Sequence, residues 1–162
     1  MRKRHQKLKL AIETLGIEFD EPRPMAVQPG IFLAQIWGCG DFEPSEQTGF
    51  FFKWRGGPRS SGLVEAYDEL VCQMNFENAT GTPTVNSSLV ENAGHVKKVV
   101  EPKSGVKFCH WIDMVAVVAY MVGVGWDDDA IIEECRFLSD PFFDVDEHYP
   151  ELKRQAQEIL SS

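Results

Sequence analysis

The sequence lacks the cysteine pairs that mark zinc sites and disulfide-rich domains. Its four cysteines, Cys39, Cys72, Cys109 and Cys135, are widely spaced, and none belongs to a CxxC pair or a close His/Cys cluster. Structural zinc needs such closely spaced ligands, so we expect reduced thiols and no metal. No cofactor is expected either.

Long apolar runs are also missing. The longest apolar stretch falls short of the ~20 residues that a membrane-spanning helix needs. The basic start Met1-Arg2-Lys3-Arg4 is not followed by the apolar segment of a secretory signal, because Lys7, Lys9 and Glu13 interrupt the hydrophobic residues. We therefore expect a cytoplasmic protein that does not engage a membrane.

Motifs that assign a reaction are absent as well. The glycine-rich loop at 55–61 follows neither the Walker pattern nor G-x-G-x-x-G. The acidic runs at 127–129 and 144–147 lack the alternating ligands, central glycine and terminal glutamate of an EF-hand. No internal repeat occurs. The sequence therefore excludes several familiar classes without naming an activity.

The composition is that of a folded protein. The chain has 162 residues, of which 43% are hydrophobic, with eleven phenylalanines and four tryptophans. A chain of this length buries roughly two thirds of its unfolded surface. We expect a single domain over 1–162, in which residues 1–7 fray and 75–92 form a long surface loop rich in Asn, Thr, Ser and Gly.

Hydrophobic periodicity and turn residues predict an α+β fold. Residues 113–122 are apolar on all sides, which is typical of a helix buried in the core. The turn Pro102-Lys103-Ser104-Gly105 predicts a hairpin between the segments 95–101 and 106–111. The predicted helices are 2–15, 62–75, 113–122, 127–138 and one that starts near Pro150, and the predicted strands are 31–37, 48–55, 95–101 and 106–111. These elements would form a small, mainly antiparallel sheet packed against one buried and several amphipathic helices, with an acidic helical C-terminal part.

The charge is unevenly distributed along the chain. Residues 1–110 hold thirteen basic and thirteen acidic side chains, whereas residues 111–162 hold three basic and twelve acidic ones, which accounts for the net charge of −9. Apolar residues at helical spacing run through these acidic clusters, so the carboxylates are expected on a folded surface. Such a surface attracts basic partners and repels nucleic acid.

The leading hypothesis is a non-enzymatic acidic binding protein. Aromatic residues among the carboxylates would anchor a partner, and the carboxylates would steer the encounter and mimic phosphates. The composition is typical of an inhibitor or immunity protein of the phage or mobile-element anti-defence type, docking on a basic, nucleic-acid-binding surface of another protein. The predicted partner-binding residues are Trp126, Asp127, Asp128, Asp129, Glu133, Glu134, Phe142, Phe143, Asp144, Asp146 and Tyr149.

The alternative hypothesis is a small cysteine-dependent hydrolase or transferase. Cys39 lies between two glycines that would leave its thiol exposed, and either His95 or His110, oriented by Asp113, would serve as its base. Against this, reactive thiols are usually activated at helix N-termini, whereas Cys39 follows a predicted strand. A buried structural thiol is the simpler interpretation.

A second candidate surface lies at 50–55. Strand alternation would place Phe51, Lys53 and Arg55 on one face and the other aromatics of this segment in the core. Arg59 would extend the same patch, in which an aromatic ring between cations suits a base and a phosphate. The acidic balance of the whole chain disfavours direct nucleic-acid binding.

Overall fold

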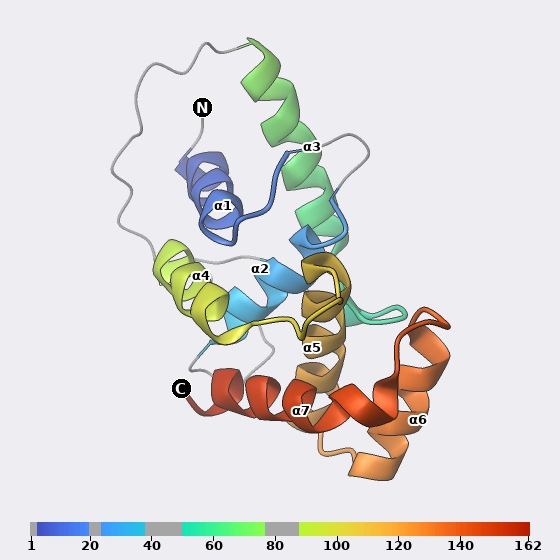
Figure 1. Cartoon of the computed structure of the whole chain (residues 1–162). Helices are drawn as coiled ribbons and strands as arrows, with labels where there is room; N and C mark the ends of the chain where they lie inside the picture. Colours follow the sequence, from blue (N-terminus) through green and yellow to red (C-terminus); the bar gives the residue numbers. More distant parts are fainter. Residues whose placement is uncertain (1–2, 20–23, 38–49, 77–87) are drawn as a thin grey trace.

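The structure is a computed structural model that describes residues 3–19, 24–37, 50–76 and 88–162. In these residues the fold is mainly helical, with one two-stranded antiparallel ladder (Figure 1). The elements are α1 (Lys3–Thr14), α2 (Val27–Ile36), β1 (Lys53–Trp54), β2 (Pro58–Arg59), α3 (Ser61–Phe76), α4 (Ser88–Val99), α5 (Phe108–Gly123), α6 (Asp128–Leu138) and α7 (Val145–Ser161). The predicted α+β class therefore holds only loosely. None of the described helices is long and apolar enough to cross a membrane.

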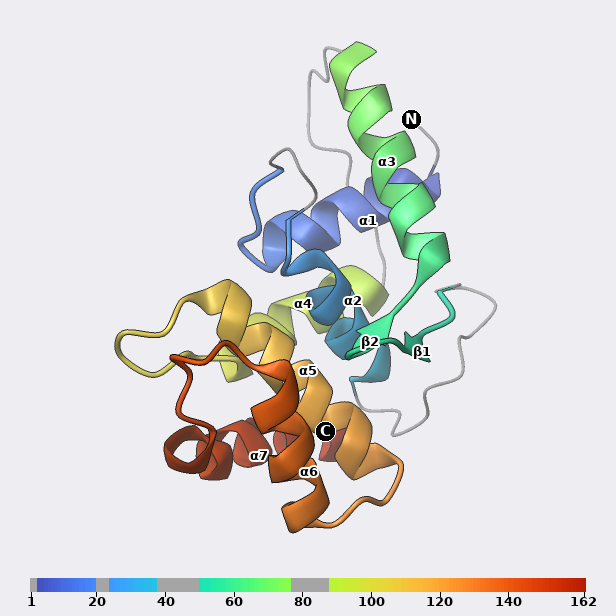
Figure 2. The same cartoon turned by 90° about the vertical axis from the view of Figure 1, so that its right-hand side faces the viewer.

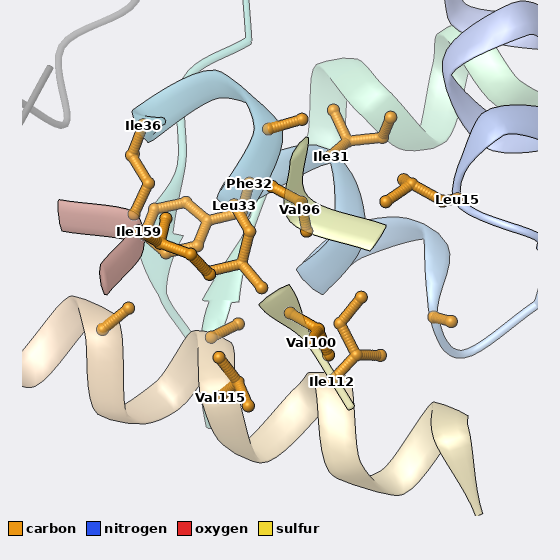
Figure 3. Packing of buried hydrophobic residues seen from close by; sticks show 14 of the residues in the cluster. Leu15, Ile31, Phe32, Leu33, Ile36, Val96, Val100, Ile112, Val115 and Ile159 are labelled. Atoms are coloured by element: carbon orange, nitrogen blue, oxygen red, sulfur yellow. The ribbon is translucent and has the colours of Figure 1, made fainter. Parts of the chain in front are cut away.

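Helix α2 lies at the centre of the hydrophobic core. It packs against α1, α4, α5 and α7. Figure 3 shows side chains of α4, α5 and α7 around it, together with Leu15, which follows α1. Ile31, Phe32, Leu33 and Ile36 of α2 are fully buried. The backbone of Gly30 lies against Leu15, the residue after α1, because a Cβ atom at Gly30 would come within 2.9 Å of a methyl group of Leu15.

The predicted strand over 31–37 is wrong, because this segment is most of α2. A short apolar run is equally compatible with a buried strand and a buried helix. Pro29 and Gly30 lie in the first turn of α2. Proline is tolerated there because the first-turn N–H groups need no intrahelical partner.

The predicted hairpin over 95–111 is wrong as well. Residues 95–99 end α4, and α5 begins at Phe108. The buried residues of α4 are Leu89, Ala93 and Val96, and with the buried Val100 that follows the helix they recur at helical spacing. The turn itself is present, since the Val106 N–H donates to the Lys103 carbonyl at 3.0 Å and Gly105 has a φ of 87°. The valines suggested strands, but packing against α1 and α2 overrides that weak propensity.

The predicted strand over 48–55 shortens to Lys53–Trp54, and residues 48 and 49 lie outside the described residues. β1 pairs antiparallel with β2 in the register Lys53 to Arg59 and Trp54 to Pro58. The connection requires glycine, because Gly56 and Gly57 have φ angles of 63° and 130°.

Several helices match their predicted ranges. These are α1, α3 and α6. Helix α5 is buried along most of its length as predicted, but it begins at Phe108, five residues before the predicted start and within a predicted strand. Residues 3–7 belong to α1, and residues 1 and 2 lie outside the described residues. Helix α4 begins at Ser88, so the loop predicted over 75–92 overlaps two helices, and its residues 77–87 lie outside the described residues.

Helix α7 begins five residues before the predicted start. The Asp144 side chain accepts a hydrogen bond from the Glu147 N–H at 3.2 Å and caps the helix, while Asp146 and Glu147 favour its positive end. Pro150 therefore lies inside α7 and is not its first residue. The helix continues because its apolar side packs on α5.

Hydrophobic spacing in the sequence also predicts eleven core residues, and all of them lie in or against one hydrophobic cluster. Six are buried and five are partly buried against it: Ile31, Phe50, Leu70, Val117, Val118 and Ile131, then Phe52, Trp54, Val99, Phe108 and Leu138. Helices α6 and α7 lie at the end of the molecule opposite α1 and α3 (Figures 1 and 2). The β1–β2 hairpin lies between these ends, beside the start of α3 (Figure 2).

Candidate functional site

Helix α6 presents an acidic outer face. Asp127 caps the helix by accepting a hydrogen bond from the Ala130 N–H at 2.9 Å, and Ile131 and Cys135 are its buried residues. Asp129, Glu133 and Phe137 recur at intervals of four, so they form one stripe on the opposite side. The side chains of both acids are exposed, and Phe137 is 82% exposed. We call Asp129, Glu133 and Phe137 the acidic α6 face.

Two exposed aromatic residues flank this face along the chain. Trp126, just before α6, is 52% exposed, and Phe142, just after it, is 97% exposed. Phe143 differs, because its ring is half-buried against Trp111 and His148, with ring centroids 6.2 and 5.0 Å away. Of the pair 142–143, Phe142 is therefore the outward residue.

Asp128 and Tyr149 connect α6 to α7. The Tyr149 hydroxyl donates to Asp128 at 2.6 Å, and Lys153 donates to the same oxygen at 2.5 Å. The hydrogen bonds from Lys153 and Tyr149 lower the pKa of Asp128, and burial together with the Asp128 contact raises that of Tyr149. Tyr149 is buried, so it positions the helices and is not available to a partner.

The remaining acidic residues of the predicted site differ in the contacts that their side chains make. Asp144 caps α7, and Asp146 is ion-paired with Arg136 at 2.6 Å, although both stay exposed. Glu134 is half-buried. Among the described residues, Asp129 and Glu133 have no cationic partner. Asp129 and Glu133 are thus exposed carboxylates with neither an ion pair nor a capping hydrogen bond among the described residues.

The residues of the cysteine-dependent alternative are only partly brought together. His110 and Asp113, one turn apart on α5, line one cleft of about 560 Å³ with His148. Asp113 is ion-paired with Arg59 at 3.0 Å, but burial still raises its pKa. His95 lies on α4, where its ring stacks on Trp37 at 5.2 Å. Cys39 lies outside the described residues.

Iodoacetamide at neutral pH is expected to modify Cys72 in the folded protein and to leave Cys135 unmodified. Burial, with a smaller contribution from Glu134, raises the pKa of the Cys135 thiol to about 12, so almost no thiolate forms, whereas Cys72 is exposed. Peptide mass mapping would measure this, with urea-unfolded protein as the control in which both cysteines react. Equal labelling of the two in folded protein would contradict the packing of α6. Labelling of Cys39 far faster than Cys72 would support the cysteine-dependent alternative.

The second predicted surface lines a cleft. As strand alternation predicted, Phe51, Lys53 and Arg55 are exposed, whereas Phe50 is buried and Phe52 and Trp54 are partly buried. Phe51, Lys53, Arg55 and Arg59 line one cleft of about 860 Å³ beside the start of α3. We call it the basic cleft.

Phe137 was missed by the sequence analysis, which grouped residues by acidic clusters. The signal was available, because Phe137 follows Glu133 by four residues and Asp129 by eight, opposite the apolar stripe of the same helix.

Within the described residues, no group of three His, Cys, Asp or Glu side chains is placed to hold a metal ion. Comparison of the chain with protein-family models, with curated proteins and with solved structures finds no match.

Proposed function

We propose that this protein is a non-enzymatic inhibitor or immunity protein of the anti-defence type. Its acidic α6 face, with Trp126 and Phe142, docks on a basic, nucleic-acid-binding surface of a partner protein. The observation that carries the proposal is the exposure of three large aromatic side chains, Trp126, Phe137 and Phe142, within the part of the chain that holds the net negative charge.

Exposed aromatic residues of this size favour a protein partner. Buried aromatic anchors account for much of the binding energy in protein interfaces, and their cost of ordering is low because few side-chain torsions become fixed. Phe137 is held on a regular helix whose other side is packed, so its backbone is ordered before any partner arrives. Less reorganisation is then needed on binding.

The charges favour a basic partner. Asp129 and Glu133 lie beside Phe137 and have no cationic partner among the described residues. Carboxylates around an apolar anchor accelerate encounter with a positive surface and disfavour acidic partners. A surface that normally binds phosphates has the required positive charge, which is why a nucleic-acid-binding protein is the proposed target.

The double variant Asp129→Lys/Glu133→Lys is expected to lose capture of this partner from a lysate of the source cell. With purified partner, the on-rate of the double variant should fall by about tenfold or more. The on-rate of the unmodified protein should fall as the salt concentration rises, because charges steer the encounter over only ~8 Å at physiological ionic strength. Phe137→Ala should act on the off-rate instead. Biolayer interferometry would separate the two rates.

The matched control is Glu18→Lys/Glu65→Lys, which makes the same change of net charge at two exposed positions away from α6. It should retain the partner. Equal loss in both double variants would mean that only net charge matters, and retention by the α6 variant would refute the proposed face. A partner that lacks a basic surface would refute the function.

A further inference from the structure

The basic cleft gathers positive charge in an acidic protein. Lys53, Arg55 and Arg59 fall within seven residues that contain no acid, and all three line the cleft. Its other walls are largely apolar, from Met25, Val27, Phe51, Leu63, Val64 and Tyr67. A volume of about 860 Å³ is in the range of small-molecule sites.

The hairpin register places two of these cations directly opposite each other. Lys53 pairs with Arg59 across the ladder, and like charges at opposed positions destabilise a strand pair. Gly57 makes room for this arrangement, because a Cβ atom there would lie 2.9 Å from the Arg59 guanidinium. Arg59 also donates a hydrogen bond to Asp113, and this contact offsets part of the repulsion between Lys53 and Arg59.

Lys53 and Arg55 have no carboxylate partner among the described residues. Both are exposed at the cleft, beside the first residue of α3, Ser61. The two uncompensated charges match a phosphate monoester, whose charge at neutral pH is about −2. The positive end of α3 adds to the same field.

The cleft also offers an exposed aromatic surface. Phe51 is 70% exposed and lines the cleft together with Lys53 and Arg55. Met25, also exposed, lines the cleft as well. An aromatic ring next to two cations suits a ligand that joins a flat ring to an anionic group.

We propose that the basic cleft binds a small phosphorylated ligand with an aromatic ring, of the nucleotide class. Lys53 and Arg55 hold the phosphate, and Phe51 stacks on the ring. A polymer is disfavoured, because a nucleic-acid chain needs a longer track of cations than two, and the net charge of −9 repels it. The cleft shares no residue with the acidic α6 face, so the proposal stands independently of the proposed function.

Isothermal titration with AMP, GMP, CMP and UMP, their nucleosides and inorganic phosphate tests the proposal. At least one mononucleotide should bind about tenfold more tightly than its nucleoside and than phosphate, since ring and phosphate both contribute. Lys53→Ala and Arg55→Ala should each weaken it by about tenfold, the effect of one charge-assisted contact. Phe51→Ala should weaken mononucleotide binding and leave phosphate binding unchanged.

Lys98→Ala, at an exposed position on α4, is the matched control and should bind as the unmodified protein does. Circular dichroism would verify that every variant is folded. The proposal is overturned if none of the four mononucleotides binds at millimolar concentration, or if Lys53→Ala and Arg55→Ala bind unchanged. Tighter binding of a single-stranded oligonucleotide of about ten nucleotides than of every mononucleotide would also overturn it, in favour of a polymer site.

Discussion

Val117→Asp is expected to abolish folding. Val117 is fully buried in α5, the apolar helix that packs against α2, α6 and α7. An unpaired carboxylate at this position costs several kcal/mol, which is comparable to the whole stability of a domain, about 5–15 kcal/mol. Circular dichroism should show loss of cooperative thermal unfolding, and size-exclusion chromatography should show an expanded or aggregated species.

Val124→Asp is the matched control for this prediction. Val124 follows the same helix and is 47% exposed, so the same substitution there should leave unfolding cooperative. Its expected effect is within about 0.5 kcal/mol of the unmodified protein, as for other surface changes. A Val117→Asp protein with native-like unfolding would contradict the placement of α5 in the core.

Gln155→Leu is expected to lower the free energy of unfolding by about 2 to 4 kcal/mol, although the two side chains are similar in size. Gln155 is buried in α7, where it accepts from the Trp111 indole N–H at 2.7 Å and donates to the Glu101 carbonyl at 2.9 Å. Leucine would leave the buried indole N–H of Trp111 without a partner and would remove the hydrogen bond to the Glu101 carbonyl. Urea unfolding followed by tryptophan fluorescence would measure the change.

Gln157→Leu, two residues further along α7 at an exposed position, provides the comparison. Its unfolding midpoint should stay close to that of the unmodified protein. An equal shift in both variants would mean that the Trp111–Gln155–Glu101 contacts contribute nothing specific. An unchanged midpoint in Gln155→Leu alone would lead to the same conclusion.

Helices with one apolar stripe could be predicted from the sequence, because their signal is local. This holds for α3 and α6, where buried residues recur at three and four and a side chain caps the first turn. Helix α2 could not be assigned in this way. It is buried on nearly every side by helices that are distant in the sequence, so its residues show no contrast between faces.

The same distinction between local signals and tertiary packing applies to the candidate sites. The outward side of 51–55 could be predicted, because alternation persists even where the ladder is only two residues long. The burial of Tyr149 could not, since it depends on α7 lying against α6. Residues 24–28 and 51–67 come together in the basic cleft only through tertiary packing, so the cleft could not be predicted from the sequence either.

One side of α6 packs on the core and stabilises the fold, whereas the other side is exposed to solvent. Ile131 and Cys135 attach the helix to the core, and Asp129, Glu133 and Phe137 make no described contact that the core needs. Substitutions along that outer stripe change folding stability by no more than about 0.5 kcal/mol. The stripe can therefore diversify during evolution, residue by residue, without compensating changes in the interior.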